Sequence, residues 1–290
     1  MTGWRGIWRR GLMALGPTLA LGSRDKVEVE RLPPFPSALL GESRTIDVFL
    51  PRGYATGAGR VYPVLYANDG QDMVAVDLAG QLDSLQQRGA MEPTIVVAVH
   101  ATERVRDYGT AGTANAQGLG DHATLYQRFM IEELMPAINA RYRTARGPAY
   151  TAMMGWSLGG LSAFDAGWEH PDIFGSVGVF SGSFWWRTDD SSIEKKQSSR
   201  IMHARIREST TRPRFKAWFE TGRQDEGADR DGDGVIDSIQ DTEELIAELV
   251  RKGFRRGVDV VHFTVEGKHD LSTWKRLLPE FLVWVYPGSE

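Results

Sequence analysis

The chain has 290 residues, of which 41% are hydrophobic and 25% charged, a balance typical of a globular protein of one or two domains. Its net charge of −4 provides no basic field for nucleic acid, so we expect no nucleic-acid partner. The lack of cysteine excludes disulfides and thiolate metal sites. No apolar run approaches the roughly 20 residues of a transmembrane helix, so we expect no membrane span.

Residues 1–25 form an N-terminal extension before the first predicted strand. Arginines within 5–10 precede a mildly apolar stretch at 11–22, whose last three residues have the small-x-small form of a signal-peptide cleavage site. The alternative is an amphipathic basic helix, with Trp4 and Trp8 on its apolar face, packed on the domain or on a membrane surface. The location therefore stays open between cytoplasm and export.

Hydrophobic periodicity divides the remainder, residues 26–290, into alternating strands and helices. Strands are predicted over residues 27–30, 45–50, 61–67, 93–99, 150–154, 176–180, 215–219 and 258–265. Helices are predicted over residues 74–87, 126–142 with a kink at Pro136, 242–253 and 271–286, and one more begins after Ser157. Long irregular segments are expected at 101–120 and 181–212. The first two strands form an antiparallel hairpin, and the alternation that follows predicts an α/β fold. Its mostly parallel sheet would have helices on both faces and ligand chemistry at the C-terminal strand ends.

The motif Gly-x-Ser-x-Gly, residues 155–159, lies between a predicted strand and a predicted helix. Such a turn holds a serine in strained backbone and lifts its hydroxyl above the sheet. Ser157 is therefore the candidate nucleophile, with the Leu158 N–H as a candidate oxyanion donor. The alternative is a glycine-rich turn whose serine only caps the helix.

A serine nucleophile needs a base and an acid that orients the base. His269 is the candidate base, because it follows the last strand and precedes the last helix. The acid is expected in the loop after the strand at 215–219, where we favour Asp225 and keep Glu220 and Glu226 as alternatives.

Other loops at strand ends supply candidate binding groups. The second oxyanion donor is expected from the turn after the strand at 61–67, where we favour the N–H of Gln71. Trp185 and Trp186 follow another strand and either pack internally or contact an acyl or aromatic group of the substrate. Arg104, in the long loop, is either solvated or available to an anionic substrate.

Residues 229–237 have the spacing of the first part of an EF-hand loop. The predicted ligands are Asp229, Asp231, Asp233, the main-chain carbonyl of Val235, and Asp237. Position 12 is Gln240 rather than glutamate, so a neighbouring acid would have to complete the shell. We expect a structural Ca²⁺ that stiffens the acid-bearing loop and no cofactor for catalysis, although a solvated acidic turn has the same composition.

The chain resembles the putative-esterase (esterase D-like) family of α/β-hydrolases. That family includes siderophore, feruloyl and acetyl-xylan esterases and mycolyltransferases. The resemblance is carried by residues 62–71, 155–160, 180–186 and 267–282. It implies one α/β-hydrolase domain over 26–290, with an insertion at about 182–212. It also implies that Ser157 is the nucleophile, His269 the base, and Leu158 and Gln71 the oxyanion donors.

The combined prediction is a serine carboxylic-ester hydrolase that acts on a small-molecule ester through a Ser-His-acid triad and an acyl-enzyme. An acyltransferase using the same residues is one alternative. The other is a non-catalytic, calcium-dependent module that binds carbohydrate or siderophore.

Overall fold

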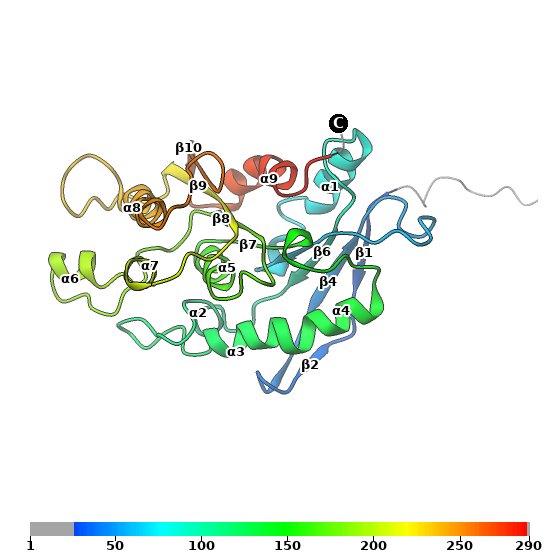
Figure 1. Ribbon diagram of the computed structural model, residues 1–290, viewed down its shortest axis with the longest axis horizontal. Coiled ribbons are helices and arrows are strands. Elements are labelled where there is room, and N and C mark those ends of the chain that lie inside the picture. The colour runs from blue at the N-terminus through cyan, green and yellow to red at the C-terminus, as the bar shows by residue number, and fades with distance from the viewer. Residues whose placement is uncertain (1–25, 289–290) are drawn as a thin grey trace, which may run out of the picture.

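The computed structural model describes residues 26–288, so the two predictions made for residues 1–25 lie outside the described part. An eight-stranded sheet crosses the molecule in the order β1-β4-β6-β5-β7-β8-β9-β10 (Figure 1). Its strands are β1 (Glu28–Arg31), β4 (Ile46–Leu50), β5 (Val64–Ala67), β6 (Ile95–Val99), β7 (Thr151–Trp156), β8 (Ser176–Phe180), β9 (Lys216–Gln224) and β10 (Val260–Lys268). Only β4 runs against its neighbours within this sheet, since it pairs antiparallel with both β1 and β6. The α/β-hydrolase fold with a mostly parallel sheet is thus confirmed.

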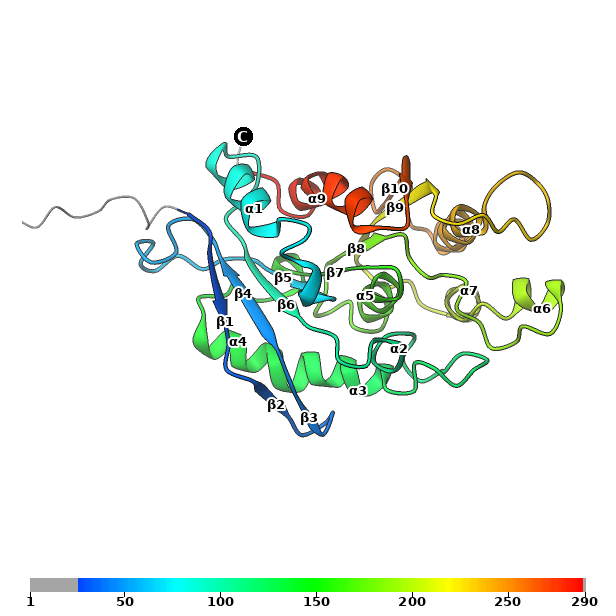
Figure 2. The same ribbon diagram turned by 180° about the vertical axis from the view of Figure 1, so that it is seen from behind.

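Helices cover both faces of the sheet, as predicted (Figures 1 and 2). The described helices are α1 (Leu78–Gln87), α2 (Arg104–Asp107), α3 (Ala123–Arg128), α4 (Met135–Arg141), α5 (Leu158–Glu169), α6 (Ile193–Ser198), α7 (Ile201–Glu208), α8 (Asp237–Arg251) and α9 (Leu271–Val285). α1 and α9 lie on one face, where their leucines belong to the same apolar cluster as Trp218 and Phe180. α4, α5, α7 and α8 contribute to the apolar core of the other face. None of the described helices has the length and apolar character needed to cross a bilayer.

The central strands are buried throughout, because helices cover both of their faces. Every residue of β5, β6 and β7 is buried. The parallel register aligns Ala67 with Ala98 and Met154, so β5, β6 and β7 end at one edge of the sheet. Side chains that follow these strands are therefore brought together there.

Several predicted segments differ from the structure. The structure has two short strands that were not predicted: β2 (Phe35–Ser37) pairs with β3 (Glu42–Arg44) in a separate two-stranded sheet. The segment at 181–212, predicted to be irregular, contains α6 and α7. These helices have only 6 and 8 residues, so their hydrophobic periodicity is too short to be recognised in the sequence. β9 continues to Gln224, so Glu220 belongs to a strand rather than to the loop after it.

The helix predicted over 126–142 is present, and its irregularity lies before Pro136. A π-helical turn, η2 (Phe129–Leu134), joins α3 to α4, and Pro136 lies in the first turn of α4. Proline has no N–H and clashes with the carbonyl four residues earlier, which a wider turn relieves. The π-helical turn is therefore the form that the expected kink takes.

Candidate active site

Ser157 is the single residue between β7 and α5. Its backbone has φ 56° and ψ −124°, a conformation that residues other than glycine rarely adopt. The conformation is held by hydrogen bonds on both sides: Ser157 N–H donates to the Phe180 carbonyl at 2.8 Å, and Ser183 N–H donates to the Ser157 carbonyl at 3.1 Å. A Cβ at Gly155 would lie 2.3 Å from the Gly159 carbonyl oxygen. The two motif glycines are thus required for the turn to close around the serine.

The turn after β5 is joined to the Ser157 turn by hydrogen bonds of Asn68. Asn68 N–H donates to the Met154 carbonyl at 3.0 Å, and Asn68 Nδ2 donates to the Gly159 carbonyl at 2.8 Å. Tyr126 in turn donates its hydroxyl hydrogen to Asn68 Oδ1 at 2.7 Å. The buried Asn68 therefore links the two turns. Asn-Asp-Gly suggests only a turn in the sequence, so this role was missed; the signal available was an asparagine directly after a buried strand.

Two backbone N–H groups remain unused where these turns meet. Among the described residues, neither Leu158 N–H nor Gln71 N–H donates a hydrogen bond. Leu158 is the first residue of α5, and Gln71 belongs to the short 3₁₀ helix η1 (Gly70–Asp72). First-turn N–H groups have no partner within their own helix and are available to an incoming oxygen.

Arg104, a predicted substrate-binding residue, is engaged within the protein. Its guanidinium donates to both carboxylate oxygens of Asp69, at 2.9 and 3.2 Å, and to the Trp156 carbonyl at 2.9 Å. Asp69 is fully buried, and burial raises its pKa although the Arg104 charge opposes the rise. A third of the Arg104 side chain stays exposed, and its bonds join the turn after β5 to the residue before Ser157.

His269 follows β10, and its Nδ1 atom lies 3.8 Å from Asp225 Oδ2. The Asp225 side chain is 1% exposed and that of His269 is 37% exposed. The His269 ring meets Trp274 edge to face, with ring centroids 5.2 Å apart. No hydrogen bond joins His269 to Ser157 within residues 26–288; the Ser157 hydroxyl instead lies 3.4 Å from that of Ser183. Catalytic hydrogen bonds are often long before substrate binds.

The two alternative acids have different surroundings. Glu220 is buried in β9, and burial with the nearby Asp225 charge raises its pKa to about 8. Burial also raises the pKa of Glu226, and the next contribution is the charge of Asp237. Asp225 is the acid that the structure places in salt-bridge range of His269.

Three other histidines have partners away from Ser157. His100 shares a hydrogen bond with Asp47 at 2.8 Å, and His262 lies between Glu243 and Thr221. His203 is buried in α7, where burial holds its pKa well below the ordinary value, and it shares a hydrogen bond with the Asp241 carbonyl.

The two adjacent tryptophans differ in solvent exposure. Trp186 is 3% exposed and packs against Gly109 and Gly120 of the long loop, so its indole forms part of the core. Trp185 is 41% exposed and follows Ser183, whose N–H is bonded to the Ser157 carbonyl. Of the pair, Trp185 is the one with surface available to a ligand.

The EF-hand-like loop brings three of its predicted ligands together. Carboxylate oxygens of Asp229, Asp231 and Asp233 lie within 4.8 Å of one another, and all three residues are exposed. Asp237 is not part of this group, since its Oδ1 accepts from Arg230 N–H at 2.9 Å. Gly232 and Gly234 have φ 73° and 88°, the left-handed conformation that lets the loop turn sharply. These oxygens suit a hard cation such as Ca²⁺.

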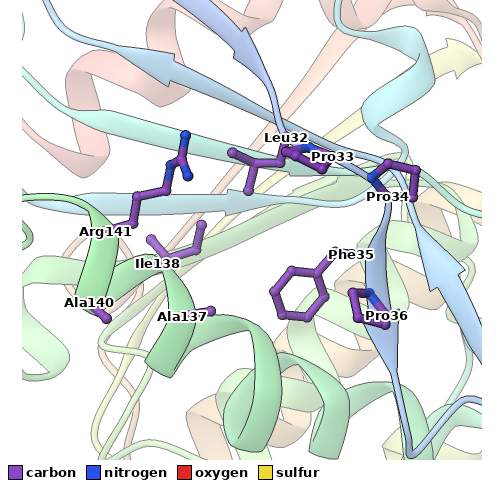
Figure 3. A pocket seen from close by; sticks show the side chains of 9 residues that line it. All are labelled: Leu32, Pro33, Pro34, Phe35, Pro36, Ala137, Ile138, Ala140 and Arg141. Carbon is purple, nitrogen blue, oxygen red and sulfur yellow. The ribbon is translucent and has the colours of Figure 1, made fainter.

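An apolar groove of about 430 Å³ lies elsewhere, between the proline-rich segment after β1 and helix α4 (Figure 3). Its walls include Leu32, Phe35 and Ile138, and Arg141 lies at one end. None of the candidate catalytic residues lines it. Chemistry is therefore assigned to the strand ends, not to this groove.

Comparison with known proteins identifies the family of the chain. The family model described as "Putative esterase" matches residues 37–285. The chain belongs to this family. The family, together with relatives named as esterases, places this chain among the carboxylic-ester hydrolases.

Individual relatives cover different shares of the chain. An uncharacterized Bacillus subtilis protein, YbbA, is 24% identical over 73% of this chain and 80% of its own length. The iron(III) enterobactin esterase of Escherichia coli K12 is 31% identical over 52% of this chain, and the endo-1,4-beta-xylanase/feruloyl esterase of Xylanibacter ruminicola is 29% identical over 51%. The matched region spans only 35% and 21% of those two enzymes.

Solved structures share the fold. A ferulic acid esterase superposes with a TM-score of 0.68 and 21% identity, over 91% of this chain and 98% of the other. The enterochelin esterase of Shigella flexneri superposes with a TM-score of 0.69 and 20% identity, over 89% of this chain and 57% of the other.

Proposed function

We propose that this protein hydrolyses a small-molecule carboxylic ester through an acyl-enzyme on Ser157. The observation that carries the proposal is the positive-φ serine at the β7–α5 turn, with two unused N–H groups beside it. A hydroxyl held in this way and flanked by free donors suits attack on a carbonyl carbon. Family membership and the named esterases among the relatives support the same reaction class.

In the proposed mechanism, the Ser157 oxygen attacks the acyl carbon while His269 takes the hydroxyl proton. Negative charge then develops on the former carbonyl oxygen, where the N–H groups of Leu158 and Gln71 would stabilise it. Asp225 holds the protonated imidazole, and the proton passes to the departing alcohol. Water attacks the acyl-enzyme by the same route, which releases the acid and restores Ser157. Trp185 is the proposed contact for the acyl or aromatic part of the substrate.

The test is hydrolysis of a graded series of nitrophenyl acyl esters and a feruloyl ester by the wild type and by Ser157→Ala. We expect turnover by the wild type and a loss of at least about 10³-fold in Ser157→Ala. The acyl length preferred by the wild type would measure the depth of the pocket. Equal rates in both proteins would remove Ser157 from the chemistry and favour a binding role.

We also propose that Asp229, Asp231 and Asp233 bind a structural Ca²⁺. The support is the convergence of their carboxylate oxygens and the left-handed Gly234 at the sharp bend. The loop lies between Asp225 and α8, so an ion there would stiffen the segment that follows the proposed acid and would take no part in bond making.

A further inference from the structure

Glu220 and Asp225 place two buried carboxyl groups close together at the end of β9. Glu220 is 1% exposed, and so is the Asp225 side chain. None of their four carboxylate oxygens makes a hydrogen bond of normal geometry with a described residue. Buried carboxylates ordinarily have such partners, so this pair calls for an explanation.

Gly222 creates the space in which the two groups meet. Glu220 and Gly222 point to the same face of β9, because side chains alternate along a strand. After Gly222 the chain turns back, with Asp225 N–H donating to the Gly222 carbonyl at 3.2 Å. A Cβ at Gly222 would lie 2.4 Å from Asp225 Oδ1. The Asp225 carboxylate therefore occupies the position that a side chain at 222 would take, next to Glu220.

Two carboxylates that share a buried site cannot both ionise without a large cost. Burial first, and then the charge of Asp225, raise the pKa of Glu220 to about 8. The Arg276 guanidinium on α9 and the Ser181 hydroxyl oppose this rise without cancelling it. The imidazole of His269 lies 3.8 Å from Asp225, so Glu220 is the member of the pair that retains the proton.

We infer that Glu220 is a positioning residue that remains a neutral carboxylic acid at neutral pH and donates its proton in a hydrogen bond to Asp225. This bond would supply the partner that Asp225 otherwise lacks and fix its carboxylate toward His269. The inference rests on the proposed function for its role in catalysis. The position of the proton is a separate property that can be measured without turnover.

Infrared spectroscopy of the full chain in D₂O at neutral pH tests the position of the proton. A protonated carboxyl gives a carbonyl stretch that is well separated from the carboxylate bands. We expect this band in the difference spectrum of the wild type minus Glu220→Gln, and its absence from the difference spectrum of the wild type minus Glu266→Gln. Glu266 is the matched control because it lies on the adjacent strand β10 and is 74% exposed. If the difference spectrum of the wild type minus Glu220→Gln lacks the band at neutral pH, the inference is overturned.

Ester hydrolysis tests the positioning role, because glutamine can donate a hydrogen bond as the neutral acid does. We expect Glu220→Gln to keep kcat/KM within about threefold, and Glu220→Leu, which fills the space without donating, to lose about tenfold or more. The loss should appear in kcat rather than KM, with a shifted acidic limb of the pH–rate profile, since the imidazole would lose its fixed anion. Equal activity of the Gln and Leu variants would contradict the positioning role. Activity that survives in Ser157→Ala would reject the proposed function and leave the infrared result standing.

Discussion

Arg104 and Asp69 form a two-bonded ion pair in which the same guanidinium also binds the Trp156 carbonyl. The pair joins the turn that carries Gln71 to the last residue of β7, next to Ser157. A planar guanidinium can make these three bonds at once, whereas an ammonium group cannot match the fork. The relative position of the two candidate oxyanion donors therefore depends on Arg104 as well as on Asn68.

The first prediction concerns Arg104. Arg104→Lys should lower kcat by about 10–100-fold with little change in KM, because the oxyanion donors would lose their fixed spacing. Arg106→Lys is the control, since Arg106 lies in the same short helix and pairs with the exposed Asp121. Steady-state kinetics with one nitrophenyl ester measures both. A rise in KM alone would return Arg104 to a substrate-binding role.

The second prediction concerns Gly222. A Cβ there would lie 2.4 Å from Asp225 Oδ1 and 2.6 Å from the Gly267 carbonyl oxygen. Gly222→Ala must therefore displace the Asp225 carboxylate and the backbone that precedes His269. We expect a stability loss of about 1–3 kcal/mol in urea unfolding and a fall of at least about tenfold in kcat/KM. Gly227→Ala, in the same loop with nothing within 4 Å, should change neither. A Gly222→Ala variant as active as the wild type would show that activity does not depend on the present position of the Asp225 carboxylate.

The third prediction separates the candidate acids. Asp225→Asn should lower kcat/KM by roughly 10³-fold or more, because the imidazolium would lose its anionic partner and its orientation. Glu226→Gln should stay within about threefold, since Glu226 has no ion pair with His269 among the described residues. The pH–rate profiles of both variants measure this. The reverse ranking would make Glu226 the acid.

The fourth prediction concerns pH and stability. The folded pKa of Glu220, about 8, lies above the ordinary glutamate value of 4.5, so the folded state holds a proton that the unfolded state releases between these two values. The wild type should therefore lose stability relative to Glu220→Gln as pH rises through this window, by at most about 1.4 kcal/mol per pH unit. Below the window the difference should be constant. Urea unfolding at a series of pH values measures it, and a flat difference throughout would mean that Glu220 ionises normally.

The fifth prediction concerns the Asp229 loop. Ca²⁺ should raise the melting temperature, because an ion that binds only the folded state stabilises that state. The rise should disappear in Asp231→Asn. Mg²⁺ should have a weaker effect, since it prefers fewer and more regular oxygen ligands. Asp189→Asn is the control, since Asp189 is a half-buried aspartate that lies outside the Asp229 loop and accepts a hydrogen bond from Ser191 N–H. An identical melting temperature with Ca²⁺ and with chelator would reject the site.

The sequence was sufficient for the order along the chain of the strands of the main sheet and for the serine turn. Apolar runs such as 95–99 and 176–180 have the length and continuity of buried parallel strands, and the structure places strands at these residues. The glycines around Ser157 also carry local information, because only small residues permit that turn. Both kinds of signal depend on neighbours in the chain, so they can be read without the fold.

The roles of Arg104, Trp186 and Glu220 were decided by tertiary structure. The sequence leaves Arg104 open to a ligand, but the fold places a buried carboxylate and a free carbonyl within its reach. Trp185 and Trp186 are equivalent as neighbours, yet one is exposed and the other covered by a loop more than sixty positions away. Glu220 is one acid among three in the sequence, and only burial beside Asp225 changes its proton affinity. Burial and charge pairing depend on contacts between distant segments, which local sequence patterns do not contain.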